Sequence, residues 1–140
     1  MQQVVAGIIL SEDKKRILLT QREGPDYEYC WCHPGGKVEP TDADNWSALR
    51  REIVEEIGVS VVDVVWFDSC TFEPPICKEP VGLTTYVCQL APWQEGLLQP
   101  LDGTIGLGWV TPAEIYGLTT TPGLTRLRDK LKNTFQRTQL

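Results

Sequence analysis

The sequence predicts an α+β fold in which helices are layered against a β-sheet, and three observations support this prediction. Segments with the composition of strands and segments with the composition of helices both occur along the 140 residues. They do not alternate regularly, as they would in a doubly wound parallel sheet. One central helix and one closing helix each carry an apolar stripe that must be buried. We therefore expect an α+β domain or a layered α/β/α sandwich.

The first 23 residues predict a β-hairpin. The apolar run at 4–10 has the composition of a buried strand, and a polar turn at 11–15 separates it from a second strand at 16–23. Gly24-Pro25 ends this strand and opens a loop. The run at 4–10 is far shorter than the roughly 20 residues that span a membrane. No basic segment precedes it, so we expect neither a membrane association nor a signal peptide.

The clearest helix is expected at 46–57, where most residues are good helix formers. At about 100° per residue, one stripe of this helix collects Trp46, Leu49, Ile53 and Ile57. Asp42 or Asp44 is the expected N-cap, and Gly58 supplies the stop.

The second half of the chain predicts three further strands and two further helices. The strands are expected at 59–65, 83–90 and 108–110. A short helix should begin at Thr111-Pro112, since proline fits the first turn. A closing helix at 123–136, Gly123 to Gln136, places Leu124, Leu127 and Leu131 on one face. Because no repeat or linker interrupts the chain, we expect a single domain over residues 1–140.

The charge and cysteine content narrow the function classes. A formal net charge of −6 argues against DNA or RNA as the main partner, because nucleic-acid binding needs a basic face. A small phosphorylated substrate remains compatible, because a bound divalent cation reverses the local field.

Five cysteines without a signal peptide predict reduced thiols and a cytoplasmic location. Cys30, Cys32 and His33 lie close together in the sequence, but their spacing is not that of a common zinc module. We therefore expect structural or incidental cysteines.

Three carboxylates stand on one side of the expected central helix. Glu52, Glu55 and Glu56 are spaced i, i+3 and i+4, so they project together and repel one another. A hard divalent cation such as Mg²⁺ prefers oxygen ligands and would remove this repulsion. On spacing alone, a solvated acidic face is the more usual interpretation of such a run.

A glycine pair precedes the acidic helix at close range. Gly35 and Gly36 allow either a positive φ or the close approach of backbone to another group. Taken alone they are compatible with an ordinary tight turn. The order of the two features, glycines first and acidic helix second, makes a site more probable than either feature does alone.

This combination resembles the Nudix box of the MutT-like hydrolases. That pattern runs Gly, five residues, Glu, seven residues, then Arg-Glu-apolar-any-Glu-Glu-any-Gly-apolar. The segment from Arg51 to Val59 matches its second half in full, and Gly36 matches its beginning. Asp42 stands in for the first glutamate, and eight residues instead of seven separate it from Arg51. We expect this longer loop to move Asp42 away from the metal site.

The resemblance implies a Nudix fold, an α/β/α sandwich with a mixed β-sheet, and a Mg²⁺-dependent enzyme in which Mn²⁺ can substitute. Glu52, Glu55, Glu56 and the Gly35 carbonyl would bind the metal. Glu52, Glu55, Glu56 and Arg51 would form the catalytic group, with Glu55 a metal ligand or the base that activates water.

The same resemblance suggests residues for the substrate. Arg22, Gly36 and Lys37 are expected to contact it, and Asp102 is a weaker candidate for a further acidic ligand, with Glu95 and Glu79 behind it. Four aromatic side chains are candidates for stacking on a base or for packing in the core: Trp31, Phe72, Trp93 and Trp109.

Three functions remain open at this point. The first is hydrolysis of a diphosphate bond in a nucleoside triphosphate by a MutT-type pyrophosphohydrolase. The second is an ADP-ribose or nucleotide-sugar pyrophosphatase, to which the segment at 74–79 has a loose resemblance. The third is a non-catalytic nucleotide sensor, which the three retained helix glutamates disfavour. In each case the partner is a small nucleotide, and the protein is expected to be a monomer or a homodimer. The base preference depends on the shape of the pocket and does not follow from the motif.

Overall fold

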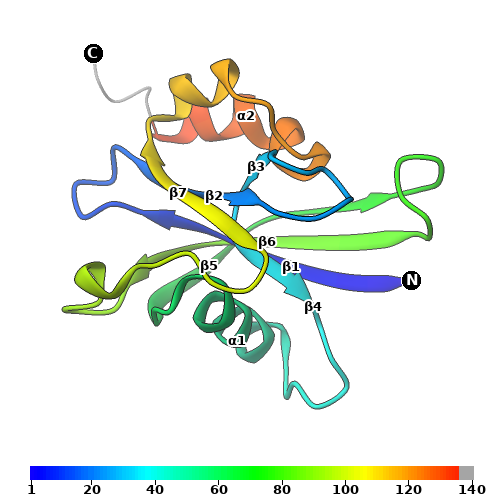
Figure 1. Cartoon of the computed structure of the whole chain (residues 1–140), viewed down its shortest axis with the longest axis horizontal. Helices are drawn as coiled ribbons and strands as arrows, with labels where there is room; N and C mark the ends of the chain where they lie inside the picture. The colour runs from blue at the N-terminus through cyan, green and yellow to red at the C-terminus, as the bar shows by residue number, and fades with distance from the viewer. Residues whose placement is uncertain (136–140) are drawn as a thin grey trace.

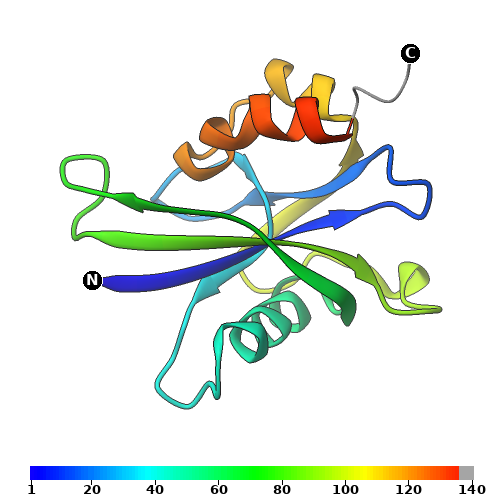
Figure 2. The ribbon, with the colours of Figure 1, turned by 180° about the vertical axis from the view of Figure 1, so that it is seen from behind.

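A twisted β-sheet lies between two layers of helix in the computed structural model, which describes residues 1–135. Helix α1 covers one face of the sheet, and α2 covers the other (Figure 1; the same layers from behind in Figure 2). The elements are β1 Gln2–Leu10, β2 Ile17–Arg22, β3 Trp31–Cys32, β4 Gly35–Lys37, α1 Asn45–Ile57, β5 Val61–Phe72, β6 Val81–Leu90, η1 Glu95–Leu97, β7 Thr104–Val110, η2 Pro112–Gly117 and α2 Pro122–Phe135.

The sheet is mixed, because β1 pairs in parallel with β6 and antiparallel with β2 and β4. The strand order is β3-β2-β1-β6-β5, with β4 also paired to β1 and β7 paired to β2. The two antiparallel partners use different parts of β1: β4 pairs with residues 4–6, and β2 pairs with residues 9 and 10. Consequently β2 and β4 leave β1 at different points along its length, and this divergence positions the pocket described below.

Helix α1 forms where the sequence predicts it and for the expected local reasons. Asp44 is the N-cap, and its side chain accepts a hydrogen bond from the backbone N–H of Ser47 at 2.8 Å. Gly58 ends the helix with a φ of 75°, a conformation that glycine adopts without strain. The side chains that α1 buries against the sheet are Ala48, Leu49, Ile53 and Ile57.

Trp46 departs from the expected apolar stripe. It stands in the first turn of α1, where its side chain is 44% exposed and lies under the guanidinium group of Arg50, 5.0 Å from the ring centroid. The stripe in the core is therefore completed by Ala48 and not by Trp46. The helical spacing of about 100° per residue predicted the direction of the stripe correctly, but the predicted stripe extended one turn too far toward the N-terminus.

The second core lies between the sheet and α2, where Leu124, Leu127 and Leu131 are buried as predicted. The predicted end of this helix, Gln136, lies outside the described residues. The short helix expected at Thr111-Pro112 is present as the 3₁₀ helix η2, and Thr111 and Glu114 form its capping box.

Two strand predictions were too short: β7 begins at Thr104 and not at Gly108, and β5 continues beyond its predicted end. Strand β5 runs to Phe72 and not to Val65, because it pairs with β6 over nearly its whole length. Register shifts within β5 and the exposure of Val65 and Trp66 disturb the alternation that would have indicated the longer strand. The glycine pair at 35 and 36 lies in strand β4, whereas a tight turn was one of the two expectations.

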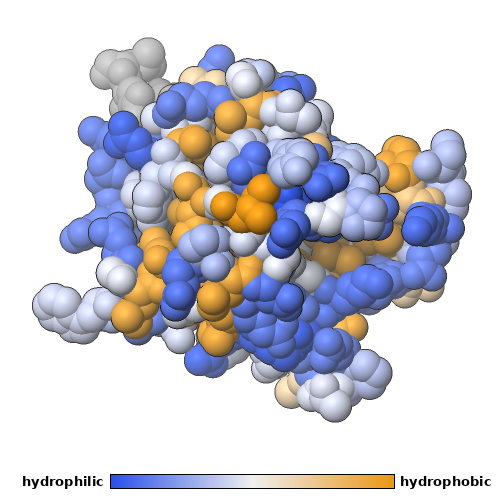
Figure 3. Space-filling view, viewed as in Figure 1, coloured by the Kyte–Doolittle hydropathy of each residue, from blue (hydrophilic) through white to orange (hydrophobic). Residues whose placement is uncertain are grey.

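On the face drawn in Figure 3, apolar residues are interspersed with hydrophilic ones. None of the helices within residues 1–135 combines the length and the apolar composition that crossing a membrane requires.

Candidate functional site

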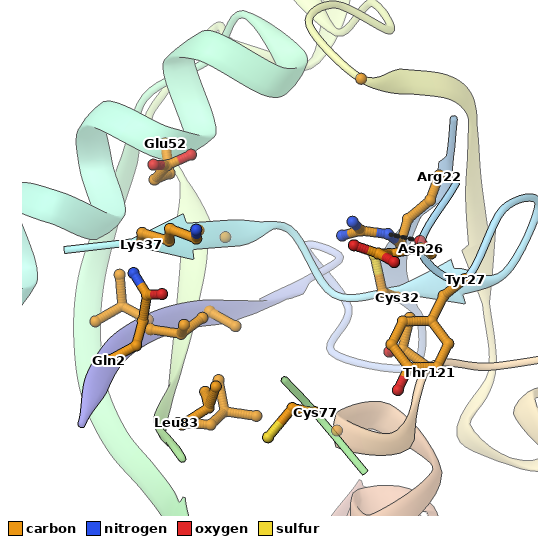
Figure 4. A pocket seen from close by; sticks show the side chains of 18 of the residues that line it. Gln2, Arg22, Asp26, Tyr27, Cys32, Lys37, Glu52, Cys77, Leu83 and Thr121 are labelled. Atoms are coloured by element: carbon orange, nitrogen blue, oxygen red, sulfur yellow. Dashed lines mark hydrogen bonds between the residues drawn. The ribbon is translucent and has the colours of Figure 1, made fainter. Parts of the chain in front are cut away.

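A pocket of about 1060 Å³ opens where β2 and β4 diverge from β1. Glu52 and Lys37 lie on one side of it, and Arg22, Asp26 and Tyr27 lie on the other (Figure 4). The three helix glutamates, the glycine pair and Asp102 also line it. The tertiary structure thus brings together residues from the hairpin, from the central helix and from the loop before β7.

The glycine pair allows β4 to lie tightly between β1 and helix α1. A Cβ atom at Gly35 would lie 2.0 Å from the carbonyl oxygen of Val5, and one at Gly36 would lie 2.4 Å from the carboxyl carbon of Glu52. Neither glycine has a positive φ. Of the two roles that the sequence left open, close approach is therefore the one that the structure uses.

Glu56 is the most strongly perturbed acid of the pocket. Its Oε2 accepts a hydrogen bond from the Gly35 N–H at 3.2 Å. The pKa of Glu56 is raised to about 8, chiefly by burial and also by the negative charges of Glu52 and Asp102, whereas the Gly35 N–H and Arg22 oppose this shift. Two or more ionised carboxylates are therefore unfavourable here in the absence of a compensating cation.

Glu52 shares this environment to a smaller degree. Its pKa is also raised, first by burial and then by the charges of Glu55 and Glu39, while Arg51 lowers it. Half-buried carboxylates that repel one another, packed against a glycine pair whose backbone is left accessible to a ligand, form a donor set that suits a hard cation. The residues present therefore fit a divalent metal ion.

The carboxylates do not form a complete metal cage by themselves. Within residues 1–135, no group of three or more His, Cys, Asp or Glu side chains is gathered closely enough to hold an ion alone. A divalent ion at this site would therefore need further ligands, such as water or an oxygen of a bound ligand.

Asp42 does not line the pocket, but it contacts the acidic group through Arg51. Its two carboxylate oxygens accept hydrogen bonds from Arg51, at 2.9 Å from Nε and 2.8 Å from Nη2. The same guanidinium group donates to Glu52 at 3.0 Å and to Glu55 at 3.3 Å. The extra residue of the loop is accommodated because Asp42 also accepts from the backbone N–H of Glu39 at 2.8 Å, which closes the loop on itself.

This network places Arg51 at the centre of the acidic group. The pKa of Asp42 is lowered to about 2, first by the hydrogen bond from Arg51 and then by that from the Glu39 backbone N–H. In return, Asp42 raises the pKa of Arg51, so both remain charged at any physiological pH. Arg51 therefore orients Glu52 and Glu55, and Asp42 orients Arg51.

Of the remaining sequence-based candidates, most line the pocket and one does not. Arg22 lines the pocket, and its Nε donates to the carbonyl oxygen of Asp26 at 3.3 Å. Lys37, Asp102 and Glu79 line the pocket as well. Glu95 lies in η1 and does not line it.

The aromatic candidates are divided in the same way. Phe72 lines the pocket. Trp31 and Trp109 pack against the cores, and Trp93 is 96% exposed. Tyr27, in the loop after β2, was not among the sequence-based candidates. It lines the pocket, and its hydroxyl donates a hydrogen bond to the carbonyl oxygen of Ile76 at 2.9 Å. A positive φ of 57° at Tyr27 follows from tertiary contacts, and no sequence pattern indicated it.

His33 was considered only as a zinc ligand, but it is a buried wall residue of the pocket. Its Nε2 lies 3.3 Å from the Thr85 hydroxyl, and burial lowers the pKa of His33 to about 4, so the ring is neutral. Cys32 instead contacts Thr20 at 3.3 Å. All five cysteines are free thiols, namely Cys30, Cys32, Cys70, Cys77 and Cys88.

The fold is that of one known protein family. The family model described as NUDIX domain matches residues 1–132, and the chain belongs to this family. The 8-oxo-dGTP diphosphatase of Haemophilus influenzae is 42% identical over 74 residues, which are 52% of this chain and 53% of that protein. The chain thus matches about half the length of this curated relative.

Solved structures agree with this assignment. A MutT structure from work on Aliivibrio salmonicida and Vibrio cholerae has a TM-score of 0.73 at 27% identity and covers 96% of this chain and 98% of that chain. The solution structure of the E. coli ORF135 protein has a TM-score of 0.76 at 28% identity, with coverages of 98% and 94%. The predicted α/β/α sandwich with a mixed sheet is confirmed.

Proposed function

We propose that this protein is a divalent-metal-dependent pyrophosphohydrolase of MutT type, which cleaves a diphosphate bond in a nucleoside triphosphate. Membership of the NUDIX family supports hydrolysis of this class, and the 8-oxo-dGTP diphosphatase relative points to a purine nucleoside triphosphate. The observation that carries the proposal is the half-buried pair Glu52 and Glu56, whose pKa values are raised and which pack against the glycine pair of β4 in the wall of a large pocket.

In this proposal Glu52, Glu55, Glu56 and the Gly35 carbonyl hold Mg²⁺, or Mn²⁺ in its place. The cation supplies the positive charge that offsets the phosphate oxygens as the substrate binds. Glu55 is the most exposed of the three carboxylates, with 45% of its side chain accessible, and Arg51 orients it. It completes the metal site or takes the proton from the attacking water.

The walls of the pocket complete the proposed site. Arg22 and Lys37 approach from opposite sides (Figure 4) and bind phosphate oxygens by charge-assisted hydrogen bonds. Gly36 contributes by lacking a side chain, since any Cβ there would collide with Glu52. Asp102 adds a further carboxylate near Glu56, where it either approaches the cation or tunes the charge of Glu56.

A substrate screen with metal control tests the proposal. Release of phosphate or pyrophosphate should be measured for the four dNTPs, 8-oxo-dGTP, ADP-ribose and nucleotide sugars. Activity on at least one triphosphate should vanish in EDTA and return with Mg²⁺ or Mn²⁺. Full activity in the chelator would refute the metal assignment, and turnover of ADP-ribose with none on triphosphates would favour the second function considered above.

A variant pair locates the chemistry. Glu56→Gln keeps size and hydrogen bonding but removes a hard-cation ligand, so kcat should fall by roughly 10²-fold or more. Glu114→Gln is a matched control, because Glu114 caps η2 and does not line the pocket. Equal activities for the two variants would show that Glu56 is not part of the machinery.

A further inference from the structure

One buried polar atom in the pocket wall has no role in the proposed metal site. His33 is 6% exposed and Thr85 is fully buried, and the Nε2 of His33 is engaged with the Thr85 hydroxyl at 3.3 Å. The other ring nitrogen, Nδ1, is buried and has no hydrogen-bond partner within residues 1–135. A buried polar atom left unpaired costs about 1–3 kcal/mol, so such an atom in a binding pocket calls for a partner from outside the chain.

His33 lies at the end of the pocket away from the acidic group. Gly123, at the start of α2, packs so closely here that a Cβ atom would lie 3.7 Å from the His33 Cε1 and 2.9 Å from a methyl group of Leu83. Leu83 and Cys77 lie opposite Glu52 in Figure 4. Phe72 also lines the pocket.

This end of the pocket differs chemically from the acidic end. Leu83 and Phe72 line the pocket together with the His33 ring and the polar side chains of Thr121 and Tyr27. Apolar walls with a few polar groups are the usual composition of a site that holds a flat organic group and fixes its orientation by one or two hydrogen bonds. If the triphosphate occupies the end with Glu52, Lys37 and Arg22, then the nucleobase extends toward His33.

We propose that His33 is a specificity-determining residue whose Nδ1 forms a hydrogen bond with an edge of the bound nucleobase. This inference rests on the proposed function, of which it specifies the base-contacting group. The Thr85 hydroxyl holds the ring through Nε2, so that only Nδ1 remains for the ligand. Because a hydroxyl can donate or accept, Thr85 supports either neutral tautomer of the ring, and the base edge selects between them.

The two ring nitrogens can be tested separately by isosteric substitution. In His33→Gln the amide reaches the position of Nε2 and can keep the Thr85 contact, but nothing replaces Nδ1. In His33→Asn the shorter amide occupies the position of Nδ1 and loses the Thr85 contact. His33→Phe keeps the ring volume and removes both nitrogens.

The experiment measures kcat/KM for the four dNTPs and 8-oxo-dGTP with each full-length variant, together with its thermal melt. We expect the ratio between the best and the worst nucleotide to fall at least tenfold in His33→Gln and His33→Phe, and to be largely retained in His33→Asn. Tenfold corresponds to about 1.4 kcal/mol, which is within the range of one lost hydrogen bond in a buried site. If His33→Phe does not fold, the Gln and Asn pair decides alone.

Two results would overturn the inference. One is a wild-type ratio in His33→Gln and His33→Phe, which would show that Nδ1 does not contact the base. The other is an equal loss for all nucleotides in all three variants, which would assign His33 a purely structural role.

Failure of the proposed function is a separate outcome. If the wild-type protein hydrolyses no triphosphate, calorimetric titration with dAMP, dGMP, dCMP and dTMP still tests His33. Selectivity among these monophosphates that disappears in His33→Gln and persists in His33→Asn supports the inference, and unchanged selectivity, or no binding of any monophosphate, overturns it.

Discussion

The raised pKa of Glu56 should make the metal-free protein less stable as the pH rises, and Glu56→Gln should remove this dependence. The pKa of Glu56 is about 8 in the folded chain, against an ordinary value of 4.5. Between these values the folded state keeps a proton that the unfolded state has released. The stabilisation is therefore complete below pH 4.5 and is lost as the pH rises through 8.

A second buried group, His33, limits the pH range in which the Glu56 effect can be measured, because its effect on stability changes with pH in the opposite direction. His33 has a pKa of about 4 in the folded chain against 6.5 ordinarily, so its contribution to stability is lost as the pH falls below 6.5. Of these two groups, only Glu56 changes its contribution to the unfolding free energy strongly between pH 6.5 and 8. A group that titrates at about 8 loses roughly 1–2 kcal/mol over this interval, at about 1.36 kcal/mol per pKa unit.

Urea unfolding in EDTA at pH 6.5 and 8.0 measures this difference. The wild-type protein should lose roughly 1–2 kcal/mol of unfolding free energy, and Glu56→Gln should lose much less. Glu55→Gln serves as the matched control, because it removes a carboxylate of the same group that is half-exposed and not held by Gly35. Excess Mg²⁺ should flatten the wild-type profile, since a bound cation stabilises the ionised form.

An equal loss of stability in the wild-type protein and in Glu56→Gln would refute the reasoning. It would mean that Glu56 is already ionised at pH 6.5 and that burial does not hold its proton. Repulsion between the half-buried carboxylates of Glu52 and Glu56 would then no longer be a reason to place a cation here.

Three further predictions follow from other parts of the structure. Asp42→Asn removes a charged acceptor of Arg51, so it should lower the melting temperature and reduce kcat by more than tenfold. A kcat within a few-fold of the wild-type value would contradict the role of this hydrogen-bond network. Leu127→Ala truncates a side chain that is 1% exposed beneath α2 and should lower the unfolding free energy by about 2–5 kcal/mol in urea melts, while an effect below 1 kcal/mol would contradict the packing. Titration with a thiol reagent should find five thiols after denaturation. In the native protein Cys32 and Cys88 should react slowly, because both are buried and burial raises the pKa of Cys88 to about 12. Rapid labelling of all five thiols in the native protein would show that the core is open.

Much of the fold follows from short-range patterns. Helix α1 and its Asp44 and Gly58 caps depend on residues three or four positions apart, which the sequence displays directly. The same spacing placed Glu52 and Glu56 on one face of the helix before any tertiary information was available. The N-terminal hairpin was predictable for a similar reason, since a short polar turn joins two apolar runs.

The length of β5 and the position of Trp46 were harder to predict, because both depend on long-range contacts. Strand β5 is extended by pairing with β6, which begins nine residues after β5 ends. Trp46 belongs to the apolar stripe by angle, but its turn of α1 extends beyond the sheet that the stripe covers.

The sequence by itself determined the acidic helix, the glycine pair and hence the class of chemistry, because each motif is local and its residue types are rarely combined for another purpose. Only the tertiary structure decided the role of Asp42 and the surroundings of His33. A count of residues along the loop suggested that Asp42 lies away from the metal site, and the folded loop places it against Arg51. The hydrogen-bond partner of His33 is Thr85, 52 residues away in β6. Burial and hydrogen-bond partners depend on the packing of the whole chain, and no local pattern encodes them.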